Sequence, residues 1–350
     1  MATSQNRNTP LEALRFLFML IVCVIHYDYD FSITSLHHGY LAVEFFFVVS
    51  VFFIYTTYQN HPQMGSLDFT YNKVKKIIIP VYICLFLQMM LDRKTYFYLP
   101  DNINPDTLLN KYFFHIHEFF FLQTIGLTTN DPIIAPLWFV SVLVVGGGLL
   151  FTLVRNYGQK AISLLIPLFI LFGINYNSLD GNVFVRNNVM YISGINPQLV
   201  RGMVAMSIGI ITSYIFEKRI KSIVNQWIFN LVGVISLAGY TLIFFAKGNH
   251  NYMLILFVPM ILISCFKSSW LNICFGWRAF NYLGSLSMYM YFVHSFVVSL
   301  VWIINSRLSS YDYKIGIITY LLMVIFASWI LKLTSTKITE IMNKKEIFKM

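Results

Sequence analysis

Long apolar runs recur along this 350-residue chain, separated by short polar segments. Each run approaches the roughly 20 residues that a helix needs to cross the hydrocarbon core of a membrane. Only 11% of the residues are charged, where a soluble domain usually carries about a quarter. The runs predict ten membrane-spanning helices, at residues 11–28, 40–58, 77–92, 134–154, 161–175, 198–216, 226–246, 251–266, 281–304 and 314–333. We therefore expect an all-α polytopic transmembrane bundle.

The formal charge of +10 follows the predicted topology. A cytoplasmic N-terminus assigns 17 of the 25 lysines and arginines to the inner segments, and basic residues favour the cytoplasmic side. This distribution predicts both termini inside, and it indicates membrane topology rather than nucleic-acid binding. Residues 1–335 then form one transmembrane domain, and residues 336–350 form a short basic cytoplasmic tail.

The first predicted span contains two ionisable residues, Arg15 and His26, whose burial in a membrane costs free energy. At about 100° per residue, their spacing of eleven places both side chains on one helical face. They lie about 16 Å apart along the axis, roughly half the hydrocarbon thickness. Two explanations stay open for these residues. Arg15 is either a snorkelling interfacial residue or part of a site, and His26 is either a wetted helix end or a functional group.

Two further spans carry polar residues that predict a site. Glu44 lies at the depth of His26 in the second span, where a carboxylate could orient the imidazole; a structural buried ion pair is the alternative. In the ninth span, Ser287, Tyr291 and His294 follow an i, i+4, i+7 spacing, which places them on one stripe. This stripe either lines a polar cavity or is satisfied between packed helices.

The segment "HIHEFFF" begins at His115. His115 and His117 are two residues apart, so on a helix they would not face the same way. The spacing therefore argues against metal binding by this pair, and we expect no metal site in the chain. Glu118 beside them could contribute to a polar cavity.

Five segments of the chain together resemble the membrane-bound acyltransferase family 3, integral-membrane O-acyltransferases that modify bacterial surface glycans. They are Arg15 and His26 with ten residues between them, "GYLAVEFFFVVSVFFI" from Gly39, "NKVKKIIIPVY" from Asn72, "PLWFVSVL" from Pro136 and "LGSLSMYMYFVHS" from Leu283. Their order and spacing hold across about residues 11–300. The chain departs from the family pattern at Val51, where glycine is usual, and in the lysines before the third span, where many relatives have arginines.

The resemblance implies transfer of an acyl group, usually acetyl, from cytoplasmic acetyl-CoA to a glycan hydroxyl on the outer side of the bacterial cytoplasmic membrane. It implies acyl-CoA as donor substrate, a polysaccharide or lipid-linked glycan as acceptor, and no permanently bound cofactor. The catalytic role of the family's first-span histidine carries over to His26. The arginine's role, in donor binding or in site integrity, carries over to Arg15, and Glu44 holds the family's acidic position. Trp138 matches the family's tryptophan.

The chemistry of the residues agrees with this activity. Acyl transfer from a thioester needs a base with a pKa near neutral, which suits His26 with Glu44 as its orienting partner; His26 could instead become transiently acylated. The tetrahedral intermediate needs a hydrogen-bond donor for its oxyanion, and Ser287 or Tyr291 could supply one. Arg15 together with Lys73, Lys75 and Lys76 places cations at the inner face for the phosphates of CoA. Membrane lipid surrounds the whole domain.

Two other classes of function fit ten spans with buried polar residues. A transporter or flippase for a lipid-linked sugar would also show them, but it would predict internal repeats and interrupted helices in two halves of the chain, which the sequence lacks. A non-catalytic relative that serves in glycan assembly is the other alternative.

Overall fold

The computed structural model describes residues 8–31, 36–98, 115–125, 132–178, 195–248, 251–307 and 315–344, and this part of the chain contains helices and no strand. The α-helices are α1 (Thr9–Phe31), α2 (Ala42–Phe52), α3 (Ile54–Asn60), α4 (Ser66–Tyr98), α6 (Ile116–Phe119), α7 (Leu137–Tyr157), α8 (Ile166–Ser178), α9 (Pro197–Ile215), α10 (Gln226–Phe245), α11 (Leu254–Lys267), α12 (Ser269–Phe275), α13 (Arg278–Arg307) and α14 (Ile317–Lys344). Short 3-10 turns precede α2 (Gly39–Leu41) and α11 (Asn251–Met253), and π-helical turns precede α8 (Ala161–Leu165) and follow α9 (Phe216–Ile220).

Eight helical segments are long and apolar enough to cross a membrane, by length and composition. The other two predicted spans are also helical: one is the shorter apolar helix at Ala161–Asn177, and the other is α11, which bends by 84° into α12. The prediction of a polytopic helical bundle is confirmed. The predicted boundary at residue 335 falls inside α14, so the described part of the basic tail continues the last helix instead of forming a separate segment.

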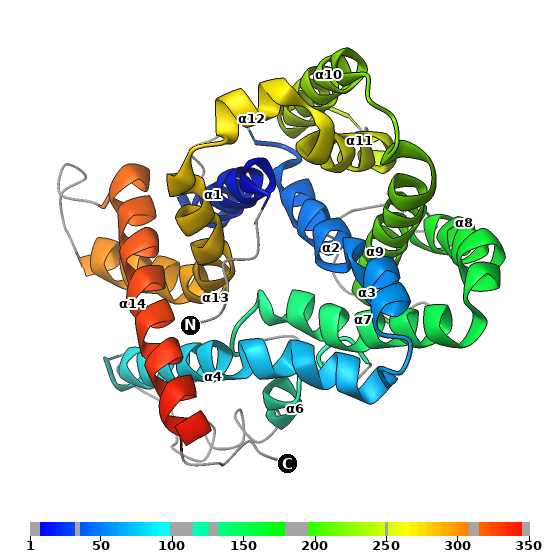
Figure 1. Cartoon of the computed structure of the whole chain (residues 1–350). Coiled ribbons are helices and arrows are strands. Elements are labelled where there is room, and N and C mark those ends of the chain that lie inside the picture. The colour runs from blue at the N-terminus through cyan, green and yellow to red at the C-terminus, as the bar shows by residue number, and fades with distance from the viewer. Residues whose placement is uncertain are drawn as a thin grey trace.

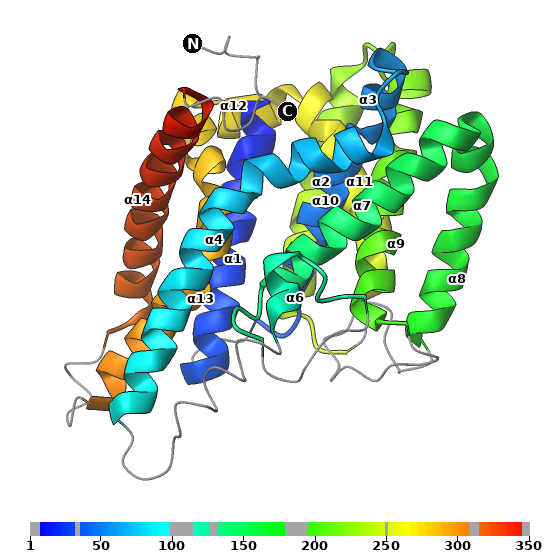
Figure 2. The same ribbon diagram turned by 90° about the horizontal axis from the view of Figure 1, so that it is seen from below.

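Helix α1 lies inside the bundle, beside α13, and α2 packs against α9 (Figure 1). Helices α4 and α7 pack against each other; α4 also contacts α13, and α7 also contacts α9. Helix α14 packs against α13. Seen from the side, α1 begins and α14 ends at the same end of the bundle, and α12 lies across that end (Figure 2). We call this the α12 end. Each site residue can therefore be placed by its distance from it.

Two glycines permit close approach of the helices that carry the site. A Cβ atom on Gly39 would overlap the side chain of Ile25 in α1, and one on Gly209 would overlap the backbone oxygen of Val48 in α2. Small residues let membrane helices pack backbone to backbone in this way. Gly39 thus lets the second span lie close to the first.

The bend between α11 and α12 has a local cause. Ser268 adopts an extended backbone, and its side-chain oxygen accepts a hydrogen bond from the N–H of Leu271 at 3.2 Å. A serine at this position ends one helix and begins the next, because its hydroxyl pairs an N–H that the new helix leaves free. The apolar run at 251–266 therefore continues into a short helix that lies across the bundle, a change of direction that hydropathy does not reveal.

Candidate active site

Helix α1 carries the two polar residues that open the candidate site. Asn8 caps its start, with the side-chain oxygen accepting the N–H of Leu11 at 2.9 Å. The helix then runs without a break through Arg15 and His26, so their spacing of eleven places both on one face, about 16 Å apart along the axis. Arg15 lies near the α12 end and His26 lies toward the opposite end.

His26 meets a second histidine, His294 of α13. The two rings lie 4.8 Å apart between centroids and are tilted by 54°. His294 is fully buried, and its Nδ1 lies 2.8 Å from the backbone oxygen of Tyr291 and 3.2 Å from that of Met290. Because a carbonyl oxygen only accepts, Nδ1 carries the proton in these bonds and Nε2 is left as the acceptor. No group in the described structure hydrogen-bonds to Nε2, which is buried. We call His26 and His294 the histidine pair.

Glu44 does not orient His26 as the sequence predicted. Its carboxylate accepts a hydrogen bond from Nε of Arg201, 157 residues away on α9, and both side chains are buried. The described residues include no hydrogen bond between Glu44 and His26. Glu44 thus forms the structural buried ion pair that was the alternative interpretation, and it joins α2 to α9. We call Glu44 and Arg201 the buried ion pair.

Arg201 was not among the residues predicted for the site. The predicted span at 198–216 nevertheless contained it, and an ionisable residue inside a membrane helix is a functional hypothesis by default. Its guanidinium carbon lies 5.4 Å from the centre of the Trp138 ring and 5.7 Å from that of Tyr40. These distances allow cation–π attraction, so two aromatic rings and one carboxylate hold the guanidinium.

The two hydroxyls predicted to stabilise an oxyanion are bonded to backbone oxygens. Ser287 donates to the oxygen of Gly284 at 2.7 Å, and Tyr291 donates to that of Pro136 at 2.5 Å. Ser287 thus turns back onto its own helix, whereas Tyr291 ties α13 to the start of α7. In this arrangement both protons are engaged, as expected for side chains satisfied between packed helices. The Tyr291 ring itself lies 5.6 Å from His294.

The predicted donor-side cations come from two helices: Arg15 lies in α1, and Lys73, Lys75 and Lys76 lie in α4. Arg15 donates to Glu12 at 3.0 Å, and Lys73 donates to the backbone oxygen of Ser50 at 2.9 Å. Arg15 and Lys76 lie close enough to Lys73 to act electrostatically on its ammonium group. The charges of Arg15, Lys73 and Lys76 therefore lie near one another, and Glu12 pairs with Arg15.

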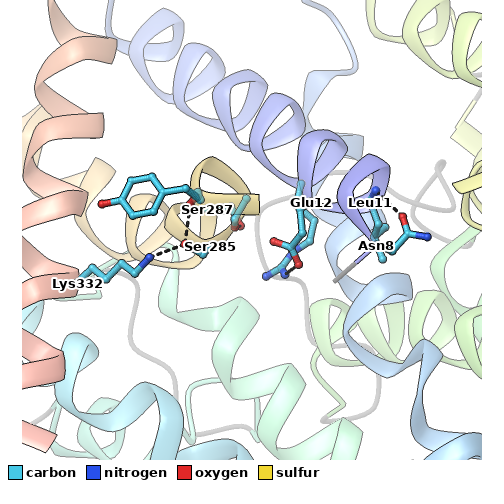
Figure 3. A network of polar contacts seen from close by, with 9 residues as sticks. Asn8, Leu11, Glu12, Ser285, Ser287 and Lys332 are labelled. Atoms are coloured by element: carbon cyan, nitrogen blue, oxygen red, sulfur yellow. Dashed lines mark hydrogen bonds and ion pairs between the residues drawn. The ribbon is translucent and has the colours of Figure 1, made fainter. Parts of the chain in front are cut away.

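A further lysine lies in the middle of α14, where Figure 3 shows it facing α13. Lys332 of α14 donates to the hydroxyl of Ser285 at 2.5 Å and lies 4.4 Å from the centre of the Tyr282 ring. The same view shows Glu12 of α1 near the start of that helix. Lys332 was not among the residues predicted for the site.

The expectation that His115 and His117 face apart is wrong. His115 precedes the short helix α6, so helical spacing does not separate the two, and their rings lie 5.8 Å apart. With Glu118 they offer ligand atoms within 4.8 Å of one another. Glu118, however, accepts hydrogen bonds from Nδ1 of His115 at 2.9 Å and from the N–H of Ile133 at 2.9 Å. These bonds fasten α6 to the segment that leads into α7, so the carboxylate already has a structural role.

Comparison with known proteins gives a match to one family. A family model described as an acyltransferase domain matches residues 8–333, nearly the whole chain, and confirms the resemblance carried by the five sequence motifs. Searches among curated proteins and among solved structures found no match. All the site residues described above lie within the matched range.

Proposed function

The chain belongs to the acyltransferase 3 family, and from this we propose that it moves an acyl group, acetyl in the first instance, from cytoplasmic acyl-CoA to a hydroxyl of a cell-surface or lipid-linked glycan. The family match and the apolar helices make it an integral-membrane acyltransferase. On this proposal both termini face the cytoplasm of a bacterium, in whose inner membrane the enzyme resides. Acyl-CoA, the glycan and lipid are its partners, and it holds no permanent cofactor.

The histidine pair is the observation that carries the proposal. An acceptor hydroxyl attacks a thioester carbonyl effectively only if a base removes its proton as the new bond forms. His26 is the base in this scheme. His294 supports it, because its hydrogen bonds to backbone oxygens fix the proton on Nδ1 and present the Nε2 lone pair inside the bundle. Two imidazoles 4.8 Å apart can hold and return one proton during the transfer.

The gathered cations support acyl-CoA as the donor. CoA carries several phosphate charges, and ammonium and guanidinium groups are the usual protein partners of phosphates. Arg15 lies about 16 Å from His26 along α1, so an extended donor could place its phosphates near one and its thioester near the other. The acceptor would then approach from the end of the bundle opposite α12.

Replacing Lys73 by methionine is expected to raise the KM for acetyl-CoA about tenfold or more, with kcat within about threefold, because a hydrogen bond to a charged group contributes about 1.5–3 kcal/mol. Initial rates at varied acetyl-CoA concentration measure this. Dephospho-acetyl-CoA, which lacks the 3′-phosphate, tests whether Lys73 binds that phosphate. If it does, the KM values of the variant and the wild type should differ less with this donor than with acetyl-CoA. Lys218→Met, an exposed lysine just after α9, is the matched control and should leave KM unchanged. An unaltered KM in Lys73→Met would remove Lys73 from the donor site.

The proposed function is tested by supplying [14C]acetyl-CoA to the cytoplasmic face of membrane vesicles that contain the full-length chain and its native glycan. We expect label in the glycan fraction, released by mild base as acetate, and none in vesicles that lack the protein. Label absent from the glycan with both acetyl-CoA and longer acyl-CoA donors would sink the proposal. Movement of unmodified lipid-linked sugar across the same vesicles would then favour a flippase.

A further inference from the structure

Acyl transfer places negative charge on the carbonyl oxygen of the transferred group, and a donor with a free N–H or O–H has to stabilise it. The hydroxyls of Ser287 and Tyr291 already donate to backbone oxygens at 2.7 and 2.5 Å. The guanidinium of Arg201 differs from both. Its Nη2 is buried and has no hydrogen-bond partner in the described structure.

The surroundings of Arg201 hold its guanidinium in place. The carboxylate of Glu44 accepts from Nε, and the rings of Trp138 and Tyr40 lie 5.4 and 5.7 Å from the guanidinium carbon. The side chain is 6% exposed, so water competes little for its remaining donors. A donor that is already oriented and dry needs no reorganisation when charge develops, which is the property of an effective oxyanion site.

Tyr291 links the surroundings of Arg201 to the histidine pair. The Trp138 ring lies 5.4 Å from the guanidinium carbon, and two residues before Trp138 the oxygen of Pro136 accepts the hydrogen bond from Tyr291. The Tyr291 ring lies 5.6 Å from that of His294, which lies 4.8 Å from His26. Glu44, Trp138 and Arg201 lie within the first five residues of α2, α7 and α9, respectively. Helix N-termini carry partial positive charge, so this region favours an anion beyond the charge of the guanidinium itself.

We propose that Arg201 is a catalytic residue whose Nη2 donates a hydrogen bond to the carbonyl oxygen of the transferred acyl group; the inference rests on the proposed acyl transfer. The acceptor hydroxyl oxygen forms a bond to the carbonyl carbon, its proton passes to His26, and the carbonyl π pair moves onto the oxygen that faces Arg201. When that pair re-forms the double bond, the carbon–sulfur bond breaks and the CoA thiolate takes the proton from His26. Glu44 acts as a positioning residue through Nε of Arg201.

The test compares variants of the full-length chain in the [14C]acetyl-CoA vesicle assay. Glu44→Gln combined with Arg201→Gln removes both charges together, so no unpaired charge stays buried. We expect this double variant to keep a thermal unfolding temperature near that of the wild type, to lose about 10²–10³-fold in kcat, and to keep its KM for acetyl-CoA within about threefold. Arg155→Gln, at an exposed arginine near the end of α7, is the matched control and should keep full kcat.

A folded double variant with wild-type kcat would overturn the inference while the proposed function stands. Arg201→Lys decides the matter if the double variant does not fold, because it keeps the charge beside Glu44 but lacks the forked Nη2 donor. We expect at least about a tenfold lower kcat in this lysine variant, and full kcat would overturn the inference. Wild-type vesicles that transfer no label would instead overturn the proposed function, and the inference with it.

Discussion

Replacing His26 by alanine is expected to lower kcat for acetyl transfer by about 10²–10⁴-fold, the usual contribution of a positioned general base. The imidazole is half-buried at the end of α1 opposite Arg15, so the donor-side cations keep their places and KM for acetyl-CoA should change little. Initial rates in membrane vesicles at saturating acetyl-CoA measure the loss, and unfolding temperature in detergent checks the fold.

His61→Ala is the matched control for this prediction. His61 is an exposed histidine between α3 and α4, and it makes no contact with the histidine pair among the described residues. This variant should keep wild-type kcat and KM. Equal rates in His26→Ala and His61→Ala would show that His26 is not the base, and the proposed chemistry would need another proton acceptor.

The sequence predicted the helical bundle and the shared face of Arg15 and His26 on α1, because both depend on local patterns. Apolar run length predicts a span, and a fixed rotation per residue predicts which side chains share a helical face. Spacing therefore placed Arg15 and His26 on one face, and it put Tyr291 one turn before His294. The bend at Ser268 was missed, since hydropathy measures polarity and carries little information about direction.

Partners on different helices could not be predicted in the same way. Glu44 pairs with Arg201 across 157 residues, and Tyr291 donates to Pro136 across 155. Both contacts depend on how α2, α9, α7 and α13 pack, which no spacing within one helix determines. The bond from Ser287 to Gly284 is different, because a serine inside a helix often donates to a carbonyl three or four residues earlier. That local rule could have removed Ser287 from the oxyanion candidates.

Replacing Glu44 alone by alanine is expected to lower the free energy of unfolding by about 3–5 kcal/mol, the effect of removing one partner of a buried ion pair. The guanidinium of the buried Arg201 would stay inside the bundle, with Nε as well as Nη2 left without a partner. Thermal or denaturant unfolding of the purified protein in one fixed detergent measures the difference.

The chain supplies its own control in Glu217, whose ion pair with Lys221 has the same charges but side chains that are 23% and 64% exposed. Solvent screens such a pair, so Glu217→Ala should cost about 0–1 kcal/mol. Equal losses in the two alanine variants would mean that the bond between Glu44 and Arg201 does not hold α2 against α9, and the fixed position of the Arg201 guanidinium would lose its physical basis.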